Sequence, residues 1–295
     1  MKFWPLYLSL SGFIYLNQAS AIEIEENGND SFNTTAPTSS NISNWNTGWG
    51  SSSVTGWNYE GTVSGASGVY LGNGWVLTAG HVGAGTFSLG GTSYNVVPGS
   101  SVGITNSNGS SADLTVFQLT LAPNLPALTI ATSPPVAASK GQAGSSVAMI
   151  GYGGGSESWG LNTVNYINYA ASVESYVSND FVTYYGTSSS PSYTNYAAIV
   201  GGDSGGGDFI YNAATATWML AGINEAYDEY SDSYMVQLNT YAVQIDGITA
   251  VPEPSLFGLF GPGLIALIWR LRFRPRGRFR IQGDHLAFAG LRGRD

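Results

Sequence analysis

The sequence predicts an all-β fold that ends in a short C-terminal helix. Between Ser52 and Ala250, short apolar or alternating runs recur about every ten residues and are separated by clusters of Gly, Ser, Asn and Pro. The 40 glycines of the chain supply turns at this spacing. A hydrophobic content of 43% in 295 residues is enough to form a core. We therefore expect a globular domain over residues 52–250.

Examples of the runs predicted as strands are 68–71, 75–77, 94–97, 114–119, 146–150, 181–185, 208–211, 218–223 and 234–238. One segment has helical periodicity instead, because Leu238, Tyr241, Ile245 and Ile248 recur at spacings of three, four and three. This spacing predicts a helix over 238–249 that packs one face on the domain. We find no internal repeat of the kind that builds a propeller or a solenoid.

Residues 1–21 have the pattern of a signal peptide. An apolar run over 3–16 is followed by the small-x-small sequence of residues 19–21, behind which signal peptidase cleaves. We predict export, with maturation near Ile22. A buried N-terminal helix is the alternative, and Pro5 disfavours it.

Residues 251–280 contain three elements in order: the sequence Val-Pro-Glu-Pro-Ser, an apolar run over 256–269, and a cluster of arginines. They resemble the PEP-CTERM sorting signal of Gram-negative bacteria. The resemblance implies recognition by an exosortase, cleavage near the motif, and release or attachment at the cell surface. Membrane contact would then occur only through this segment, with the arginines on the cytoplasmic side.

The tail over 281–295 departs from that pattern, which leaves a transient or retained membrane anchor open. A simple C-terminal membrane helix is the other interpretation, although the apolar run is shorter than the roughly 20 residues that span a bilayer.

The segment between the two signals is strongly acidic. Residues 22–254 contain 17 acidic residues and a single basic one, Lys140. Such a charge excludes nucleic acid as a partner. The chain has no cysteine, which excludes disulfides and thiol chemistry. Residues 22–51 are rich in Asn, Ser, Thr and Glu without any periodicity, so we expect a flexible N-terminal segment or a short propeptide.

The sequence Gly201-Gly202-Asp203-Ser204-Gly205-Gly206 is the clearest candidate for chemistry. A serine hydroxyl needs an imidazole base and a carboxylate that orients the imidazole. Glycines before Ser204 allow a turn that points the backbone N–H groups of Gly202 and Ser204 at one spot, as in an oxyanion hole.

Two further segments offer the partners. His81 follows the apolar run 75–77 and a small-residue turn, and the other histidine, His285, lies beyond the arginine cluster. Asp113 opens the alternating run 114–119. Taken alone, this histidine is typical of a hydrogen-bonded structural residue and this aspartate of a strand start.

Together, the three segments resemble the chymotrypsin/trypsin family of serine proteases, in the same chain order and over about residues 60–250. The resemblance implies two six-stranded antiparallel β-barrels with the site between them. It also implies Ser204 as nucleophile, His81 as base, Asp113 as its orienting carboxylate, and Gly202 and Ser204 as the oxyanion hole. The implied activity is that of a secreted serine endopeptidase acting on peptide or protein substrates.

Some positions depart from the family pattern. Gly80 stands where the family usually has a second alanine, a change small enough to be harmless. No activation motif precedes Gly61, so the usual partner of Asp203, a newly freed N-terminus, is not evident in the sequence. We expect Asp203 to be satisfied by neutral donors, by Lys140 or by a cut terminus.

The preference for substrate is weakly encoded. In this family the residue six before the nucleophile lies at the base of the specificity pocket, and here it is Ala198. An apolar base disfavours cleavage after Lys or Arg. Four acidic residues either make the pocket mouth acidic or form a solvated loop, and the sequence favours the loop; they are Glu225, Asp228, Glu229 and Asp232.

Other functions are less consistent with the sequence. An inactive surface or matrix binding protein would use exposed aromatics, for which Trp45, Trp49, Trp57 and Trp159 are the candidates. A lipase or esterase needs Gly-x-Ser-x-Gly and a later histidine. No cofactor is expected: one exported histidine cannot supply the usual zinc ligands, and the acidic residues 228–232 lack a recognisable calcium motif.

Overall fold

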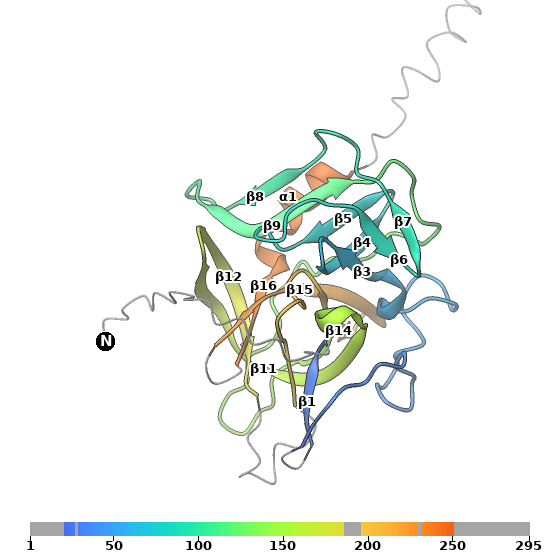
Figure 1. Cartoon of the computed structure of the whole chain (residues 1–295). Coiled ribbons are helices and arrows are strands. Elements are labelled where there is room, and N and C mark those ends of the chain that lie inside the picture. Colours follow the sequence, from blue (N-terminus) through green and yellow to red (C-terminus); the bar gives the residue numbers. More distant parts are fainter. Residues whose placement is uncertain (1–20, 27–28, 186–195, 229–231, 251–295) are drawn as a thin grey trace, which may run out of the picture. The chain divides into compact units, whose positions relative to one another are not determined.

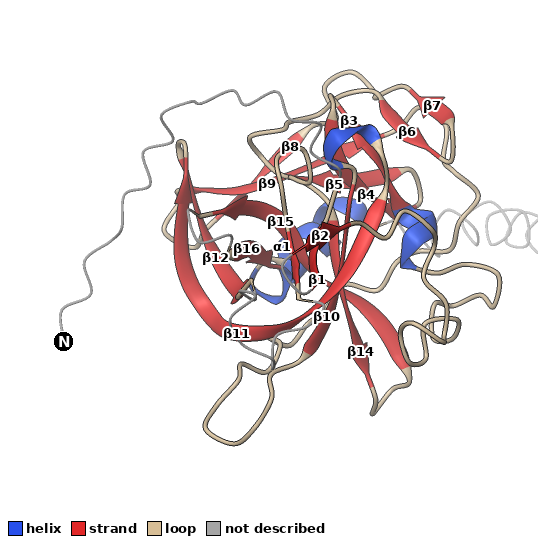
Figure 2. Ribbon diagram, turned by 60° about the horizontal axis from the view of Figure 1, so that its bottom comes forward, coloured by secondary structure: helices blue, strands red, loops and turns tan. Residues whose placement is uncertain are grey.

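The computed structural model describes residues 21–26, 29–185, 196–228 and 232–250, which form mostly strands with one short α-helix near the C-terminal end (Figure 1, Figure 2). The predicted all-β fold is thus confirmed, and its strands form two barrel-like halves. Among the described residues, no helix is long and apolar enough to cross a membrane. The predicted apolar segments 3–16 and 256–269 lie outside the described residues.

The first half is a seven-stranded antiparallel sheet with the strand order β7-β6-β3-β4-β5-β9-β8. Its strands are β3 (Glu60–Val63), β4 (Ala66–Gly72), β5 (Trp75–Thr78), β6 (Phe87–Leu89), β7 (Thr92–Tyr94), β8 (Val102–Thr105) and β9 (Ser111–Gln118). The central strands β4, β5 and β9 are buried over nearly their whole length. They therefore hold the residues that follow β5 and those on β9 in fixed positions.

The second half is a closed six-stranded barrel with the order β10-β11-β12-β16-β15-β14. Its strands are β10 (Ser146–Gly151), β11 (Ser158–Val173), β12 (Tyr176–Thr183), β14 (Gly207–Asn212), β15 (Thr217–Tyr227) and β16 (Ser233–Gln237). Closure leaves no free edge in this sheet. The loop before β14 carries Ser204.

A small third sheet joins the N-terminal end to the second half. In this sheet β1 (Glu23–Glu26) pairs with both β2 (Asn29–Ser31) and β13 (Ala197–Ala198). Ala21 and Ile22 are fully buried. The start of the predicted mature chain is thus part of the folded domain.

The segment 22–51 was expected to be flexible, and the structure corrects this expectation for its described part. Trp45 and Trp49 are buried and pack against Phe209 and Trp218, with Trp49 stacked on Trp218 at 5.4 Å between ring centroids. Large aromatic surfaces offset the polar composition that predicted flexibility. Trp159 is also buried, and Trp57 packs against the same core. These tryptophans therefore do not form the exposed aromatic surface that the binding-protein alternative requires.

The predicted C-terminal helix over 238–249 is present as a short 3-10 turn over Leu238–Thr240 followed by α1 (Ala242–Thr249). Leu238, Tyr241 and Ile245 are buried against the core, as their spacing predicts. The Tyr241 hydroxyl donates to Asn106 Oδ1 at 2.8 Å and so ties this segment to the loop after β8.

Candidate active site

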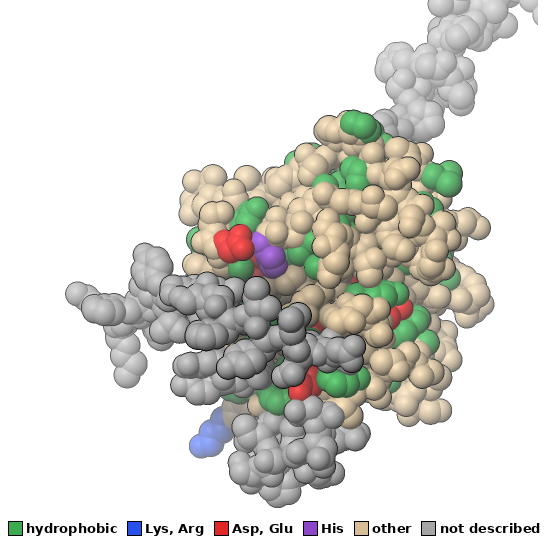
Figure 3. All heavy atoms as spheres, viewed as in Figure 1, with side chains coloured by type: hydrophobic (Ala, Val, Ile, Leu, Met, Phe, Trp, Pro, Cys, Tyr) green, Lys and Arg blue, Asp and Glu red, His purple; other side chains and the backbone are tan. Residues whose placement is uncertain are grey.

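The structure brings His81 and Asp113 into direct contact. His81 lies three residues after the end of β5, and Asp113 lies on β9, which pairs with β5. Asp113 Oδ2 is 2.6 Å from His81 Nδ1, and Asp113 Oδ1 accepts the backbone N–H of His81 at 2.7 Å. Two contacts to one buried carboxyl fix both the backbone and the ring of the histidine. Figure 3 shows the histidine at the surface, whereas Asp113 is fully buried.

The surroundings of His81 favour its protonated form. Burial lowers the pKa of the imidazole, but the hydrogen bond and the charge of Asp113 outweigh burial and raise this pKa above its ordinary value of 6.5. The side chain of His81 is 19% exposed. The ring is therefore both basic and reachable from solvent, as a proton acceptor must be.

The structure gives a reason for glycine at position 80 that the sequence did not reveal. A Cβ atom at this position would lie 2.9 Å from Tyr176 Cε1 and 2.9 Å from Asp113 Oδ1. The Tyr176 hydroxyl also donates to the Gly80 carbonyl at 3.1 Å. Glycine therefore fits at this position, because Tyr176 and Asp113 occupy the space that a methyl group would need. That glycine in place of the usual alanine is harmless stays a prediction.

Ser204 lies in the loop between β13 and β14, and backbone hydrogen bonds hold it between the two halves. Its carbonyl accepts the N–H of Ser67 from β4, and the next residue, Gly205, donates to the Asn224 carbonyl on β15, both at 2.9 Å. A side chain at Gly205 would collide with Ser67 and Thr78, and its φ of +90° also favours glycine. The glycine after the nucleophile candidate thus permits a close approach to the first half.

The Ser204 hydroxyl donates to the backbone carbonyl of Glu225 at 3.5 Å. Within the described residues it shares no hydrogen bond with His81. Both side chains are only partly buried, and the hydroxyl turns by rotation about one bond. Catalytic hydrogen bonds are often long or absent before substrate binds.

The backbone N–H groups of Gly202 and Ser204 donate to no acceptor among the described residues. The intervening N–H of Asp203 does have a partner, the Val200 carbonyl at 3.1 Å. Gly202 has a φ of +101°, which an L side chain rarely adopts. In this loop, the hydrogen-bonded N–H of Asp203 is therefore flanked by the two unpaired N–H groups of Gly202 and Ser204.

Ser67 is a further part of this site that the sequence did not reveal. Its buried hydroxyl donates to the Gly202 carbonyl at 3.1 Å and accepts the N–H of Tyr152 at 2.8 Å. The residue sits on β4 in a segment without any motif. Its role depends on a contact between halves that are far apart in the chain, so no local signal could have indicated it.

Asp203 is fully buried, and neutral donors satisfy it. Its carboxyl accepts the N–H groups of Gly153 and Val200, both at 2.8 Å, and that of Ile22. Burial raises the pKa of Asp203 to about 7, and these hydrogen bonds limit the increase. Lys140 is exposed, and the only ion pair within the described residues joins His81 to Asp113.

Ala198, the expected base of the specificity pocket, lies on β13 and is 1% exposed. It pairs with Glu23 of β1, and the neighbouring Ala197 carbonyl accepts Asn162 Nδ2 at 2.7 Å. The role of Ala198 in specificity stays a prediction.

The acidic residues expected in a solvated loop are partly structural. Glu225 is on β15 and is 2% exposed, so it does not belong to a loop. Asp228 accepts the Asp232 N–H at 3.1 Å and the Tyr234 hydroxyl at 3.0 Å, which closes the turn between β15 and β16. Glu229 lies outside the described residues.

Comparison with known proteins supports the assignment of this fold. The model of the trypsin family matches residues 47–241, about two thirds of the chain. Among curated proteins, none matches the chain significantly.

Three solved structures are similar in fold at low identity. The Rv3671c protease of M. tuberculosis in its inactive form is 16% identical, with 78% of this chain and 89% of that chain covered and a TM-score of 0.44. The NS6 protease of murine norovirus 1 is 15% identical, with 62% and 90% covered and a TM-score of 0.40. A mutant of human heparin binding protein is 14% identical, with 67% and 94% covered and a TM-score of 0.47.

Proposed function

This chain belongs to the trypsin family, and from this premise we propose that it is a serine endopeptidase with His81, Asp113 and Ser204 as its catalytic residues. The observation that carries the proposal is the double contact of Asp113 with the backbone and the ring of His81. The Ser204 loop adds two N–H groups that have no acceptor among the described residues. A protease of this family acts on peptide or protein substrates.

The proposed reaction begins when His81 takes the proton of the Ser204 hydroxyl as its oxygen attacks the scissile carbonyl carbon. The carbonyl oxygen becomes an oxyanion, which the N–H groups of Gly202 and Ser204 stabilise. Asp113 stabilises the imidazolium of His81. The imidazolium then gives its proton to the leaving amine, and an acyl-enzyme remains on Ser204. His81 then deprotonates a water molecule, whose oxygen attacks the ester carbon, and the imidazolium gives this proton to the Ser204 oxygen as the acyl bond breaks.

The proposed substrate preference is for peptides with an uncharged side chain at the cleaved residue. Ala198 offers no counter-charge to a lysine or arginine, and burying such a cation without a partner is costly.

Export and surface localisation are part of the same proposal. Signal peptidase would remove residues 1–21, and an exosortase would act on residues 251–280, as the sequence pattern predicts. The protease domain over 52–250, together with the packed segment before it, would then act outside the cell.

Labelling with a fluorophosphonate tests the proposal, because this reagent reacts with activated serines. The wild-type protein should label, and the variants Ser204→Ala and His81→Ala should not. Ser53→Ala, which changes an exposed serine far along the chain from the motif, should label like the wild type. A folded wild type that never labels would contradict the proposal. For Asp113→Asn we expect labelling to slow by about 10⁴-fold, because the imidazole loses its orienting carboxylate.

A further inference from the structure

Two more buried carboxyl groups lie behind Asp113. Ser178 on β12 accepts the Asp113 backbone N–H at 3.0 Å and donates its hydroxyl to Glu225 Oε1 at 2.8 Å. Glu225 in turn shares a side-chain hydrogen bond with Asp180. Asp180 is fully buried, and Glu225 is 2% exposed. One chain of contacts therefore runs from Asp113 through Ser178 and Glu225 to Asp180.

The contact between Glu225 and Asp180 requires a proton. Two ionised carboxylates have only acceptors, and both oxygens of Asp180 and Oε2 of Glu225 would then be buried without any donor. Burial, followed by the charge of Glu225, raises the pKa of Asp180 well above its usual range. The pKa of Glu225 is also raised by burial, but its hydrogen bonds from Asp180 and Ser178 oppose the increase. One proton shared by the two carboxyl groups therefore satisfies the contact, and the pair carries a single negative charge.

The groups around Glu225 determine which cation its negative charge stabilises. Asp113 faces it from β9, Asp180 from β12 and Tyr241 from the end of the 3-10 turn before α1. His81 is the only cationic group that acts on the pKa of Glu225, and Glu225 acts on His81 in turn. Lys140 is exposed. A negative charge on Glu225 is thus balanced by the imidazolium and by no other cation within the described residues.

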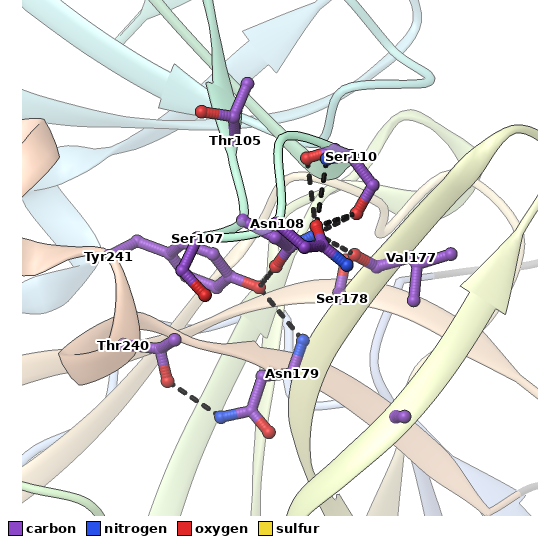
Figure 4. A pocket seen from close by; sticks show the side chains of 11 residues that line it. Thr105, Ser107, Asn108, Ser110, Val177, Ser178, Asn179, Thr240 and Tyr241 are labelled. Carbon is purple, nitrogen blue, oxygen red and sulfur yellow. Dashed lines mark hydrogen bonds between the residues drawn. The ribbon is translucent and has the colours of Figure 1, made fainter.

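Glu225 also contacts Ser204, at the other end of the site. The backbone carbonyl of Glu225 accepts the Ser204 hydroxyl, whereas its side chain holds Ser178. Ser178 lines a cavity of about 370 Å³ as well, together with Asn106, Ser107 and Asn179 (Figure 4). The labelled side chains around this cavity are uncharged, so the cavity supplies no competing ion.

We propose that Glu225 and Asp180 are positioning residues of the active site, which together hold one proton and one negative charge behind Asp113 and stabilise the imidazolium of His81. This inference rests on the proposed function of His81 as the base. Positive charge develops on His81 during acylation, and a second fixed negative charge in a buried place favours that state. The shared proton prevents a third buried negative charge beside Asp113 and Glu225.

Four forms of the full chain test this inference: Glu225→Gln, Asp180→Asn, the double variant and the unchanged pair. Each carries His285→Ala, so that His81 is the only histidine and its ring protons report its titration by NMR. In the double variant the pair cannot carry charge, and the pKa of His81 should fall by about one unit. Glu225→Gln should lower it as well, because any remaining charge moves to Asp180.

Asp180→Asn is the decisive variant. The asparagine amide donates to Glu225 as the acid did and leaves the negative charge on Glu225, so the pKa of His81 should stay at the value of the unchanged pair. A merely structural role of the pair would make all three variants alike. An unchanged His81 titration in a folded double variant would overturn the inference, as would a rise of this pKa in Asp180→Asn.

Glu174→Gln is the matched control. Glu174 also raises the pKa of His81, but its side chain is exposed. In 0.5 M salt the screening length is on the order of 4 Å, so the effect of Glu174 should disappear. The effect of the buried Glu225 should persist. The titration needs no activity, which separates the two proposals. If the wild type fails to label with fluorophosphonate but the His81 shift occurs, the protease assignment fails and the carboxyl pair stands. Far-UV circular dichroism shows that each variant is folded.

Discussion

Ile22 donates its backbone N–H to the buried carboxyl of Asp203, the residue directly before Ser204. The first residue of the predicted mature chain thus contacts the loop that carries the proposed nucleophile. Sequence reasoning left the partner of Asp203 open between neutral donors, Lys140 and a cut terminus. The structure shows neutral donors, one of which is the nitrogen that cleavage after Ala21 would free.

We predict that a free amino group at Ile22 stabilises the domain at neutral and higher pH. The pKa of Asp203 is raised to about 7, so its ionisation destabilises the folded state as pH rises from 4 to 7. An ammonium group would lower this pKa and remove the penalty, which is about 4 kcal/mol for a shift of this size. Denaturant unfolding at pH 8 should show this difference between the chain that begins at Ile22 and the same chain acetylated there, which keeps an N–H without the charge.

The difference should shrink at pH 4, where Asp203 is protonated in both forms. In the variant Asp203→Asn it should vanish at every pH. Equal stability of the free and acetylated chains at pH 8 would show that the Ile22 ammonium does not reach Asp203.

Gly80→Ala should impair catalysis although the added group is a single methyl. The new Cβ would press on Tyr176 and on the carboxyl oxygen of Asp113 that accepts the His81 N–H. We expect kcat/KM to fall by at least about tenfold, a magnitude typical of misplaced catalytic groups. Adding Tyr176→Ala should recover part of the loss by making room. If Gly80→Ala alone retains full activity, the crowding at this position has no effect on catalysis.

Ser67→Ala should lower kcat more than it raises KM. Without its hydroxyl the Gly202 carbonyl and the Tyr152 N–H lose a shared partner, and the proposed oxyanion loop is held less firmly. Removing an oxyanion donor outright typically costs about 10²- to 10³-fold in kcat, and Ser67→Ala only loosens the loop that holds the donors, so we expect a smaller decrease of about ten- to one hundredfold. Steady-state kinetics on a peptide ester give both constants, and Thr92→Ala on the exposed part of β7 is the control. An effect on KM alone would place Ser67 in substrate binding instead.

Glu60→Gln should stabilise the protein at pH 8 and change it little at pH 4. Burial, with a smaller contribution from the charge of Glu157, raises the pKa of Glu60 well above its usual range, and the carboxyl accepts the Gly207 N–H. A group with a raised pKa costs stability as pH rises above its unfolded value of about 4. Glutamine keeps the acceptor and cannot ionise. Thermal unfolding across this pH range measures the effect, and a lower melting temperature at pH 8 would contradict it.

The strands that sequence predicted best are those with strong apolar patterns. Residues 75–77 and 114–119 correspond to β5 and β9, which are buried at nearly every position. The longest strand, β11, was missed because asparagine and tyrosine interrupt its pattern. Asn162 is nevertheless buried, because its amide donates to the carbonyls of Tyr184 and Ala197. These partners are distant in the chain, so the local sequence gives no indication of them.

The residues of the candidate site also fall into two groups, those that a sequence motif indicates and those that no motif indicates. His81, Asp113 and Ser204 stand in motifs that can be found residue by residue, and the structure places the first two in contact. Ser67, Ser178 and Glu225 have no such motif, and they act through hydrogen bonds to residues that are distant in the chain. For Glu225 the neighbouring Asp228 and Asp232 even indicated a solvated loop, because charge density alone does not distinguish a strand interior from a turn.

The pairing of β1 with β13 also orders the events of folding. Ile24 and Ala197 are register partners although about 170 residues separate them, so β1 leaves the ribosome long before its partner exists. Until β13 follows, the first mature strand has no neighbour on that side, and Ile22 cannot reach Asp203. The Ser204 loop therefore acquires the support of Ile22 only after almost the entire domain has been synthesised.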